Sequence, residues 1–287
     1  MRFMNTKFSQ GRQIVINIKR LVPSLNPKER LIAEYILSFP SEISTITITE
    51  MADKLQVSQG WIVKFCKKLG LEGFAELKEQ FNASPTDYFD EEFEISDSPK
   101  QILMKSFKNS IQAMTDCLNS IHEDTFENVC HILMKAPKID LYGFGGSGAI
   151  AMDAYHKFLR IGLNSAVFTD HNMQLISASL LKKGDVAIGI SHSGRTTAIV
   201  NSLKLAKQVG ATTIAITNFA DMPLTKVADY SLFSVAGGNP ITGENATARL
   251  AQLAILDSLF IYLSLHKKDA MKNLAKTIDS VKTSRIE

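Results

Sequence analysis

The chain has 287 residues, of which 45% are hydrophobic and 21% charged, the composition of a soluble globular protein with one large or two modest domains. The net charge of +3 is too small to indicate a partner, so its distribution along the chain carries the information. Three distant cysteines, Cys66, Cys117 and Cys130, exclude a paired-disulfide pattern or metal-ligand spacing and predict free thiols in a reducing cytosol.

Neither the N-terminal sequence nor the most apolar segment indicates a membrane. No long apolar run follows Met1, so a secretory signal is not expected. The apolar helical pattern over 248–265 contains Arg249, Gln252 and Asp257, which favours a buried or interface helix over a membrane span. We therefore expect a soluble, cytoplasmic protein.

The first eighty residues predict a series of helices. Patterns over 14–22 and 27–39 are helical, and Asn26 can cap the second. Thr47 and Glu50 form a capping box that opens a short helix. After a tight turn, Ser58 is expected to cap another helix that ends at Gly70.

This last helix has one apolar and one basic face. Its apolar face carries Ile62, Phe65, Cys66 and Leu69, and its outer face carries Lys64, Lys67 and Lys68. Residues 1–80 hold twelve Lys or Arg against eight Asp or Glu, a net charge of +4. Two short helices with a basic second helix predict a helix-turn-helix that binds DNA. A solvated helical bundle is the alternative.

The segment that begins at Ile46, ITITEMADKLQVSQGWIVKFCKKLGLEGFAELK, resembles the helix-turn-helix of the RpiR/MurR family of bacterial transcriptional regulators. Trp61 departs from the small residue usual there, and it either reads DNA or belongs to an interface. The resemblance implies double-stranded DNA as a partner, with base contacts near the helix start and phosphate contacts from the lysines. The candidate residues are Thr47, Ser58, Gln59, Trp61, Lys64, Lys67 and Lys68.

Residues 81–100 change in character. Six acidic residues face one lysine there, a net charge of −5, and Pro85 and Pro99 bracket the stretch. This composition predicts an interdomain linker, with an autoinhibitory segment as the alternative. Helical patterns follow over 100–120 and 123–135.

From Lys138 onward, strand and helix patterns alternate. Such an order predicts a three-layer αβα domain with a parallel sheet, which binds ligands at the carboxyl ends of its strands near a switch in strand order. The five expected strands are 139–143, 166–168, 186–190, 213–217 and 230–234. The chain is thus expected to join an all-α domain (1–80) through a linker (81–100) to an α/β domain (101–287).

Two loops of this domain carry the candidate chemistry. Ser191, Ser193 and Thr196 lie between a buried strand and a helix, where unpaired N–H groups and the helix dipole favour an anion. Simple capping of the helix by Ser193 or Thr196 is the alternative. The earlier loop, GFGGSG at 143–148, matches the dinucleotide pattern GxGxxG, with Asp170 as the possible ribose-binding acid. The second hydroxyl-rich loop favours a sugar phosphate instead.

GFGGSG, SHSGRT and the later ATARLAQLAILDSLF together resemble the SIS (sugar isomerase) domain found in RpiR-type regulators. The resemblance implies that hydroxyls hold the phosphate of a phosphosugar, that glycines let the backbone approach it, and that a histidine after the second strand contacts the sugar; here His171 stands one place earlier than the family's histidine. Glu244, in the loop before the last helix, is a further candidate to bond sugar hydroxyls. Glu244 as a helix cap is the alternative, and His192 is expected to be structural. The phosphate-site candidates are Gly145, Gly146, Ser147, Ser191, Ser193, Gly194 and Thr196.

The two resemblances together imply a transcriptional regulator whose affinity for its operator changes when a phosphosugar binds. A homodimer or homotetramer on a palindromic operator is expected, without catalytic residues, metal or cofactor. One alternative is a phosphosugar isomerase or lyase with a helical extension, for which Glu244 and His171 are the available bases. Another is a phosphosugar-responsive protein that no longer binds DNA.

Overall fold

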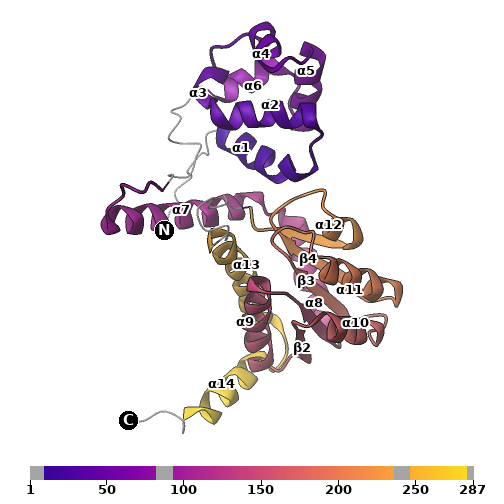
Figure 1. Cartoon of the computed structure of the whole chain (residues 1–287). Helices are drawn as coiled ribbons and strands as arrows, with labels where there is room; N and C mark the ends of the chain where they lie inside the picture. Colours follow the sequence, from indigo (N-terminus) through magenta and orange to yellow (C-terminus); the bar gives the residue numbers. More distant parts are fainter. Residues whose placement is uncertain (1–9, 82–92, 236–245, 283–287) are drawn as a thin grey trace. The chain divides into compact units, whose positions relative to one another are not determined.

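The computed structural model describes residues 10–81, 93–235 and 246–282. The chain divides into two compact units, Met1–Asn109 and Ser110–Glu287, and the division falls within the long helix α7 (Pro99–Ser120) (Figure 1). All three cysteines are buried free thiols. Burial raises the pKa of Cys66 and Cys117 to about 12 and that of Cys130 to about 11, so these thiols are poor nucleophiles at neutral pH.

The described part of the N-terminal unit is helical, as predicted. The Asn26 side chain caps α2 by accepting a hydrogen bond of 3.0 Å from the Glu29 N–H, and the Glu29 carboxylate in turn accepts one from the Asn26 N–H. Thr47 and Glu50 form the predicted capping box at α4. The elements are α1 (Gln10–Leu21), a 3₁₀ turn (Val22–Ser24), α2 (Pro27–Ser38), α3 (Pro40–Ile43), α4 (Ile48–Leu55), α5 (Gln59–Lys68) and α6 (Phe74–Gln80).

Helices α4 and α5 form the helix-turn-helix. Gln56 adopts a left-handed conformation in the turn between them (φ 51°). Ile62, Phe65 and Cys66 of α5 are fully buried in the core of this unit, as their spacing predicts. Ser58 occupies the N-cap position, but contrary to the prediction its hydroxyl makes no capping bond. Ser58 is exposed, so water can satisfy the first N–H groups of α5 instead.

The C-terminal unit contains the predicted five-stranded parallel sheet, in the order β2-β1-β3-β4-β5. Side chains alternate between its two faces: Leu141 and Ile188 enter one core, whereas Tyr142 and Ala187 enter the other. The strands are β1 (Ile139–Tyr142), β2 (Ser165–Phe168), β3 (Val186–Ile190), β4 (Thr212–Thr217) and β5 (Tyr230–Phe233).

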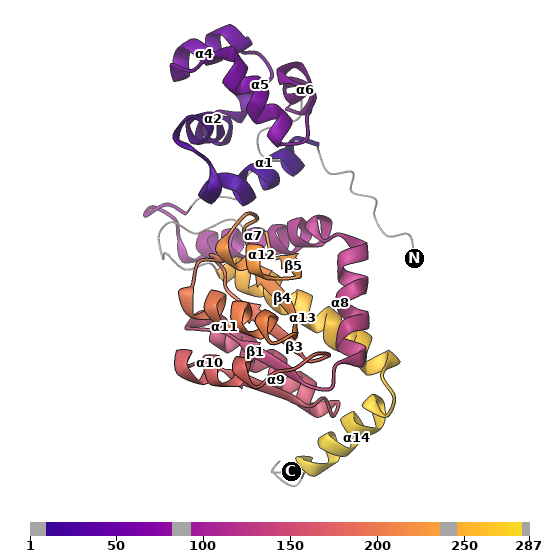
Figure 2. The same ribbon diagram turned by 90° about the vertical axis from the view of Figure 1, so that its right-hand side faces the viewer.

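Helices cover both faces of this sheet. One layer contains α8 (Glu123–Lys135), α9 (Gly146–Arg160) and α13 (Ala246–His266), and the other contains α10 (His171–Ser179), α11 (Thr197–Gln208) and α12 (Pro223–Val227) (Figure 1). Helix α8 lies beside α13, and α14 (Ala270–Ser280) follows α13 in the chain (Figure 2).

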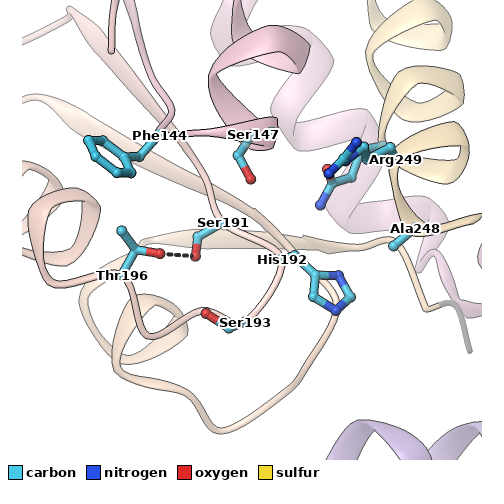
Figure 3. Close-up of a pocket in the computed structure, with 10 residues that line it drawn as sticks. Phe144, Ser147, Ser191, His192, Ser193, Thr196, Ala248 and Arg249 are labelled. Atoms are coloured by element: carbon cyan, nitrogen blue, oxygen red, sulfur yellow. Dashed lines mark hydrogen bonds between the residues drawn. The ribbon is translucent and has the colours of Figure 1, made fainter. Parts of the chain in front are cut away.

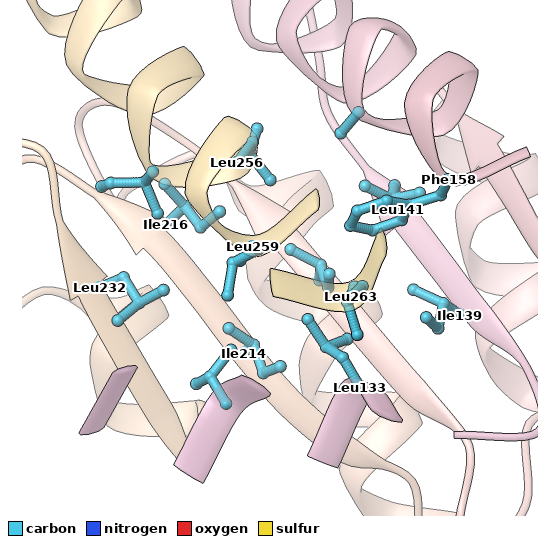
Figure 4. Packing of buried hydrophobic residues seen from close by; sticks show 14 of the residues in the cluster. Leu133, Ile139, Leu141, Phe158, Ile214, Ile216, Leu232, Leu256, Leu259 and Leu263 are labelled. Carbon is cyan, nitrogen blue, oxygen red and sulfur yellow. The ribbon is translucent and has the colours of Figure 1, made fainter. Parts of the chain in front are cut away.

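Helix α13 is long and apolar enough, by composition, to cross a membrane, and 44% of its most apolar window is buried inside the protein. Leu256, Leu259 and Leu263 of this helix pack on Ile214 and neighbouring side chains of the sheet (Figure 4). This packing supports its interpretation as a core helix.

The strand order places a topological switch between β1 and β3. The chain leaves β1 toward β2 through α9 and leaves β3 toward β4 through α11, in opposite directions across the sheet. The two helices therefore lie on opposite faces, and both begin at the carboxyl ends of neighbouring strands.

Candidate functional site

A cavity of about 330 Å³ opens at this switch point (Figure 3). Residues from three segments line it: the loop after β1 with the start of α9, the loop after β3, and the first turns of α13. The lining residues are Phe144, Gly146, Ser147, Ser191, His192, Ser193, Thr196, Ala248, Arg249 and Gln252. Parallel α/β sheets bind ligands at such positions.

The loop after β3 presents its hydroxyls to this cavity. Ser191 is buried, and its Oγ lies 3.0 Å from Oγ1 of Thr196. Thr196 stands at the N-cap of α11 but makes no side-chain capping bond, and Ser193 Oγ accepts from the Arg195 N–H at 3.2 Å. The capping alternative is therefore not what the structure shows. The N-terminus of α11 has neither a capping side chain nor an acidic residue in its first turn, which suits it to an anion.

Helix α9 brings a second N-terminus to the same place. Gly145 begins it in a left-handed conformation (φ 54°) without a capping side chain, and its first turn also lacks an acidic residue. Ser147 directs its hydroxyl toward the cavity (Figure 3). Two helix N-termini and four hydroxyl groups thus meet at one cavity, an arrangement complementary to a phosphate dianion.

Helix α13 supplies the opposite wall. The guanidinium of Arg249 packs against Gly146, where a Cβ would lie only 2.7 Å from Nη2. Gln252, one turn further along α13, is buried at the cavity wall. Sequence reasoning used both residues only as evidence against a membrane span and missed their place in the site. The available signal was a cation and an amide one turn apart in an otherwise apolar helix.

His192 is the titratable residue between these two walls. Its ring meets Phe219 edge to face, with centroids 5.4 Å apart. Burial, and then the positive charge of Arg249, lower the pKa of His192 to about 4, so the imidazole is neutral near pH 7. None of the described lining residues is Asp or Glu, and Arg249 is the charged group among them.

The other predicted residues of this site lie outside the lining set. Gly194 has a left-handed backbone (φ 64°) and packs against Met222, and like Gly145 it shapes a loop. His171 begins α10 and does not line the cavity. The predicted Glu244 lies outside the described residues.

Asp170, the acid of the dinucleotide alternative, has a structural role. Its carboxylate caps α10 by accepting a 3.0 Å hydrogen bond from the Met173 N–H. This cap places the start of α10 at His171.

On the helix-turn-helix, Trp61 of α5 is half-buried and packs at the edge of the N-terminal core. The ammonium groups of Lys28 and Lys64 lie 5.4 and 5.1 Å from its ring centroid, a cation–π arrangement that holds the indole in place. Gln59 Nε2 donates to Thr49 Oγ1 at 3.0 Å, which connects the start of α5 to α4. Lys28, on α2, was not among the predicted residues.

The predicted DNA-contacting residues differ in their surroundings. Lys64 and Lys67 are exposed. Lys68 pairs with Glu29 at 2.9 Å, and the Glu29 side chain is only 7% exposed, so Lys68 joins α5 to α2. Thr47 uses its hydroxyl in the capping box of α4.

Comparison with known proteins finds two domain families in the chain. A model of the helix-turn-helix domain, rpiR family, matches residues 12–85, and the SIS domain model matches residues 132–262. The HTH-type transcriptional regulator RpiR of Escherichia coli K12 is 34% identical over 258 residues, which cover 88% of this chain and 87% of that protein. The chain belongs to the RpiR family of transcriptional regulators. An uncharacterised HTH-type regulator of Caldanaerobacter subterraneus is also 34% identical, over 94% of this chain and 97% of that protein.

Solved structures share the fold of this chain. The NanR protein of Vibrio vulnificus, complexed with ManNAc-6P, aligns with a TM-score of 0.63 at 20% identity, over 96% of this chain and 100% of that one. The sugar isomerase domain of an RpiR transcription factor from Sphaerobacter thermophilus aligns with a TM-score of 0.58 at 22% identity, over 62% and 99% of the two chains. At these identities the likeness establishes the fold.

Proposed function

We propose that this RpiR-family regulator binds a phosphosugar in its SIS domain, and that the bound ligand changes the affinity of the helix-turn-helix for an operator. The cavity at the β1/β3 switch carries the proposal, because the N-termini of α9 and α11 and four hydroxyl groups converge on it. The fold-level likeness to NanR, solved with ManNAc-6P, supports it.

The phosphate belongs at the hydroxyl side of this cavity. Ser191, Ser193 and Thr196 follow β3, Ser147 follows β1, and all four line the same space. Donors of this kind make charge-assisted hydrogen bonds to phosphate oxygens. The dipoles of two helices add positive potential at the same point. Gly145 and Gly194 shape the two loops.

The DNA-binding role rests on the outer side of α5. Lys64 and Lys67 provide exposed positive charge for phosphates, and Gln59 and Trp61 stand in the first turn, which enters the major groove in helix-turn-helix proteins. A homodimer would place two such helices on a palindromic operator. We propose that the protein acts in this form in the cytoplasm.

The described lining residues favour a sensor over an isomerase. Sugar isomerisation needs a general base with a pKa near the working pH. Among the described lining residues the titratable base is His192, whose pKa is lowered to about 4 by burial and by Arg249. The family is one of transcriptional regulators, which agrees with a binding role.

A gel-shift titration with DNA from upstream of the protein's own operon tests the proposal. We expect binding that weakens steeply with salt, and one member of a panel of sugar phosphates should change the apparent dissociation constant. Failure to bind this DNA at low salt, together with turnover of a hexose phosphate, would contradict the regulator and favour the enzyme.

A further inference from the structure

Gln252 is a buried polar residue whose surroundings do not explain it. Its side chain is 1% exposed, and its Nε2 has no hydrogen-bond partner in the structure. Buried amide groups in folded proteins are almost always paired. A donor left without a partner therefore requires a reason.

Packing does not supply that reason. Ala248, Ala251 and Ile255, which lie within one turn of Gln252 on α13, are all buried and apolar. A leucine at position 252 would match them in polarity. The amide is therefore retained at a cost in stability, which points to a partner that arrives with a ligand.

The position of Gln252 indicates which end of a bound ligand it would contact. It lines the cavity one turn after Arg249, whose guanidinium packs against Gly146. Figure 3 shows Arg249 and Ala248 of α13 across the cavity from the hydroxyls of Ser191 and Thr196. A ligand whose phosphate is held by those hydroxyls has its other end at α13.

We propose that Gln252 is a specificity-determining residue that recognises the non-phosphate end of the phosphosugar by donating a hydrogen bond to one of its oxygens. This inference rests on the proposed function. Arg249 beside it is only a donor, and the described lining residues include no carboxylate. A sugar hydroxyl would bring a proton of its own, for which Oε1 of Gln252 or the neutral imidazole of His192 would have to act as acceptor. An oxygen that only accepts, that of a carboxylate or an N-acyl carbonyl, satisfies Nε2 without this requirement.

Calorimetric titration of the full-length protein and its Gln252→Leu variant tests the proposal. The probes are inorganic phosphate and two matched pairs: 6-phosphogluconate with sorbitol 6-phosphate, and N-acetylglucosamine 6-phosphate with glucose 6-phosphate. The first pair tests whether a carboxylate on the ligand is recognised, and the second tests whether an N-acyl carbonyl is recognised. Gln208→Leu, which changes an exposed glutamine on α11, is the control.

In the native protein we expect the first member of at least one pair to bind more tightly than the second. Gln252→Leu should weaken that member about tenfold, the size of one lost hydrogen bond, and abolish the preference. Binding of inorganic phosphate should stay unchanged. The melting temperature of the ligand-free variant should equal or exceed that of the native protein, because an unpaired amide is removed.

Three results would overturn the role of Gln252: no preference within either pair, equal weakening of inorganic phosphate, or a melting temperature lowered by several degrees, which would show a structural role. Binding of inorganic phosphate without any of the four sugar phosphates would also overturn it. If inorganic phosphate does not bind either, the phosphosugar site itself is wrong.

Discussion

Ser191 combines burial with a position at the point where the anion is expected. Its hydroxyl lies 3.0 Å from that of Thr196 and both line the cavity. Ser191→Ala removes a donor to a charged group, worth about 1.5–3 kcal/mol, so phosphosugar affinity should fall roughly 10- to 100-fold. Calorimetry measures this. Ser179→Ala, whose exposed hydroxyl bonds within α10, is the control. An unchanged dissociation constant for Ser191→Ala would mean that the phosphate is misplaced.

Two neighbouring lysines of α5 should give opposite results when replaced. Lys68 pairs with the nearly buried Glu29. Lys68→Ala removes the cationic partner of the Glu29 carboxylate, which should lower the free energy of unfolding by about 1–2 kcal/mol and lower the melting temperature. Lys67 is exposed, so Lys67→Ala should leave the melting temperature unchanged and reduce the salt dependence of DNA binding by about one phosphate contact. Thermal unfolding and salt-dependent gel shifts measure the two effects. Equal melting temperatures for the two variants would contradict this assignment.

The lowered pKa of His192 makes stability depend on pH. Burial and Arg249 bring this pKa from an ordinary 6.5 to about 4 in the folded protein. Between these values the unfolded chain binds the proton and the folded chain does not. The free energy of unfolding therefore falls as the pH drops from 6.5 to 4, by up to about 3 kcal/mol. Melting temperatures of the ligand-free protein and of His192→Asn across this range measure the effect. The variant's curve should be shallower, and parallel curves would contradict the lowered pKa.

At the scale of elements, the loop between β3 and α11 depends on one glycine. Gly194 has a φ of +64°, and a Cβ there would lie 2.7 Å from Cβ of Met222. Gly194→Ala should therefore cost about 1–3 kcal/mol and displace the hydroxyls that follow β3. Gly60→Ala lies in the first turn of α5, where an added Cβ would meet only Oγ of Ser58 at an ordinary 3.8 Å, and it should instead raise stability by about 0.5–1 kcal/mol. Thermal unfolding compares them, and a stable Gly194→Ala variant would show that the loop can relax.

Elements with strong local signals were predictable from sequence. The cap at Asn26, the capping box at Thr47 and the alternating strands appear in the structure as expected, because each depends on residues a few positions apart. The short helices α3, α6 and α12 were not predicted, since four to seven residues carry too little periodicity. The α13 wall of the cavity was missed for another reason. Arg249 meets Gly146 only after folding brings together residues about a hundred positions apart, and no local pattern reports such a contact.

At the scale of the whole molecule, a sensor must obey linkage between its two ligands. If a phosphosugar changes the operator dissociation constant by some factor, the operator must change the phosphosugar dissociation constant by the same factor. Calorimetric titration of the effector with and without operator DNA measures this, and an unrelated duplex of equal length is the control. An effector dissociation constant that stays the same with and without saturating operator DNA would show that the two sites are not coupled.

The switch between β1 and β3 has a consequence for how such a regulator can acquire a new effector. Backbone topology brings the ends of α9 and α11 together there, so affinity for an anion is a property of the strand order as much as of any side chain. Side chains on the first turns of α13 are under no such constraint. We therefore expect substitutions there to change the preferred sugar while the phosphate contacts stay the same, so that new specificities would be accessible through single substitutions without rebuilding the sheet.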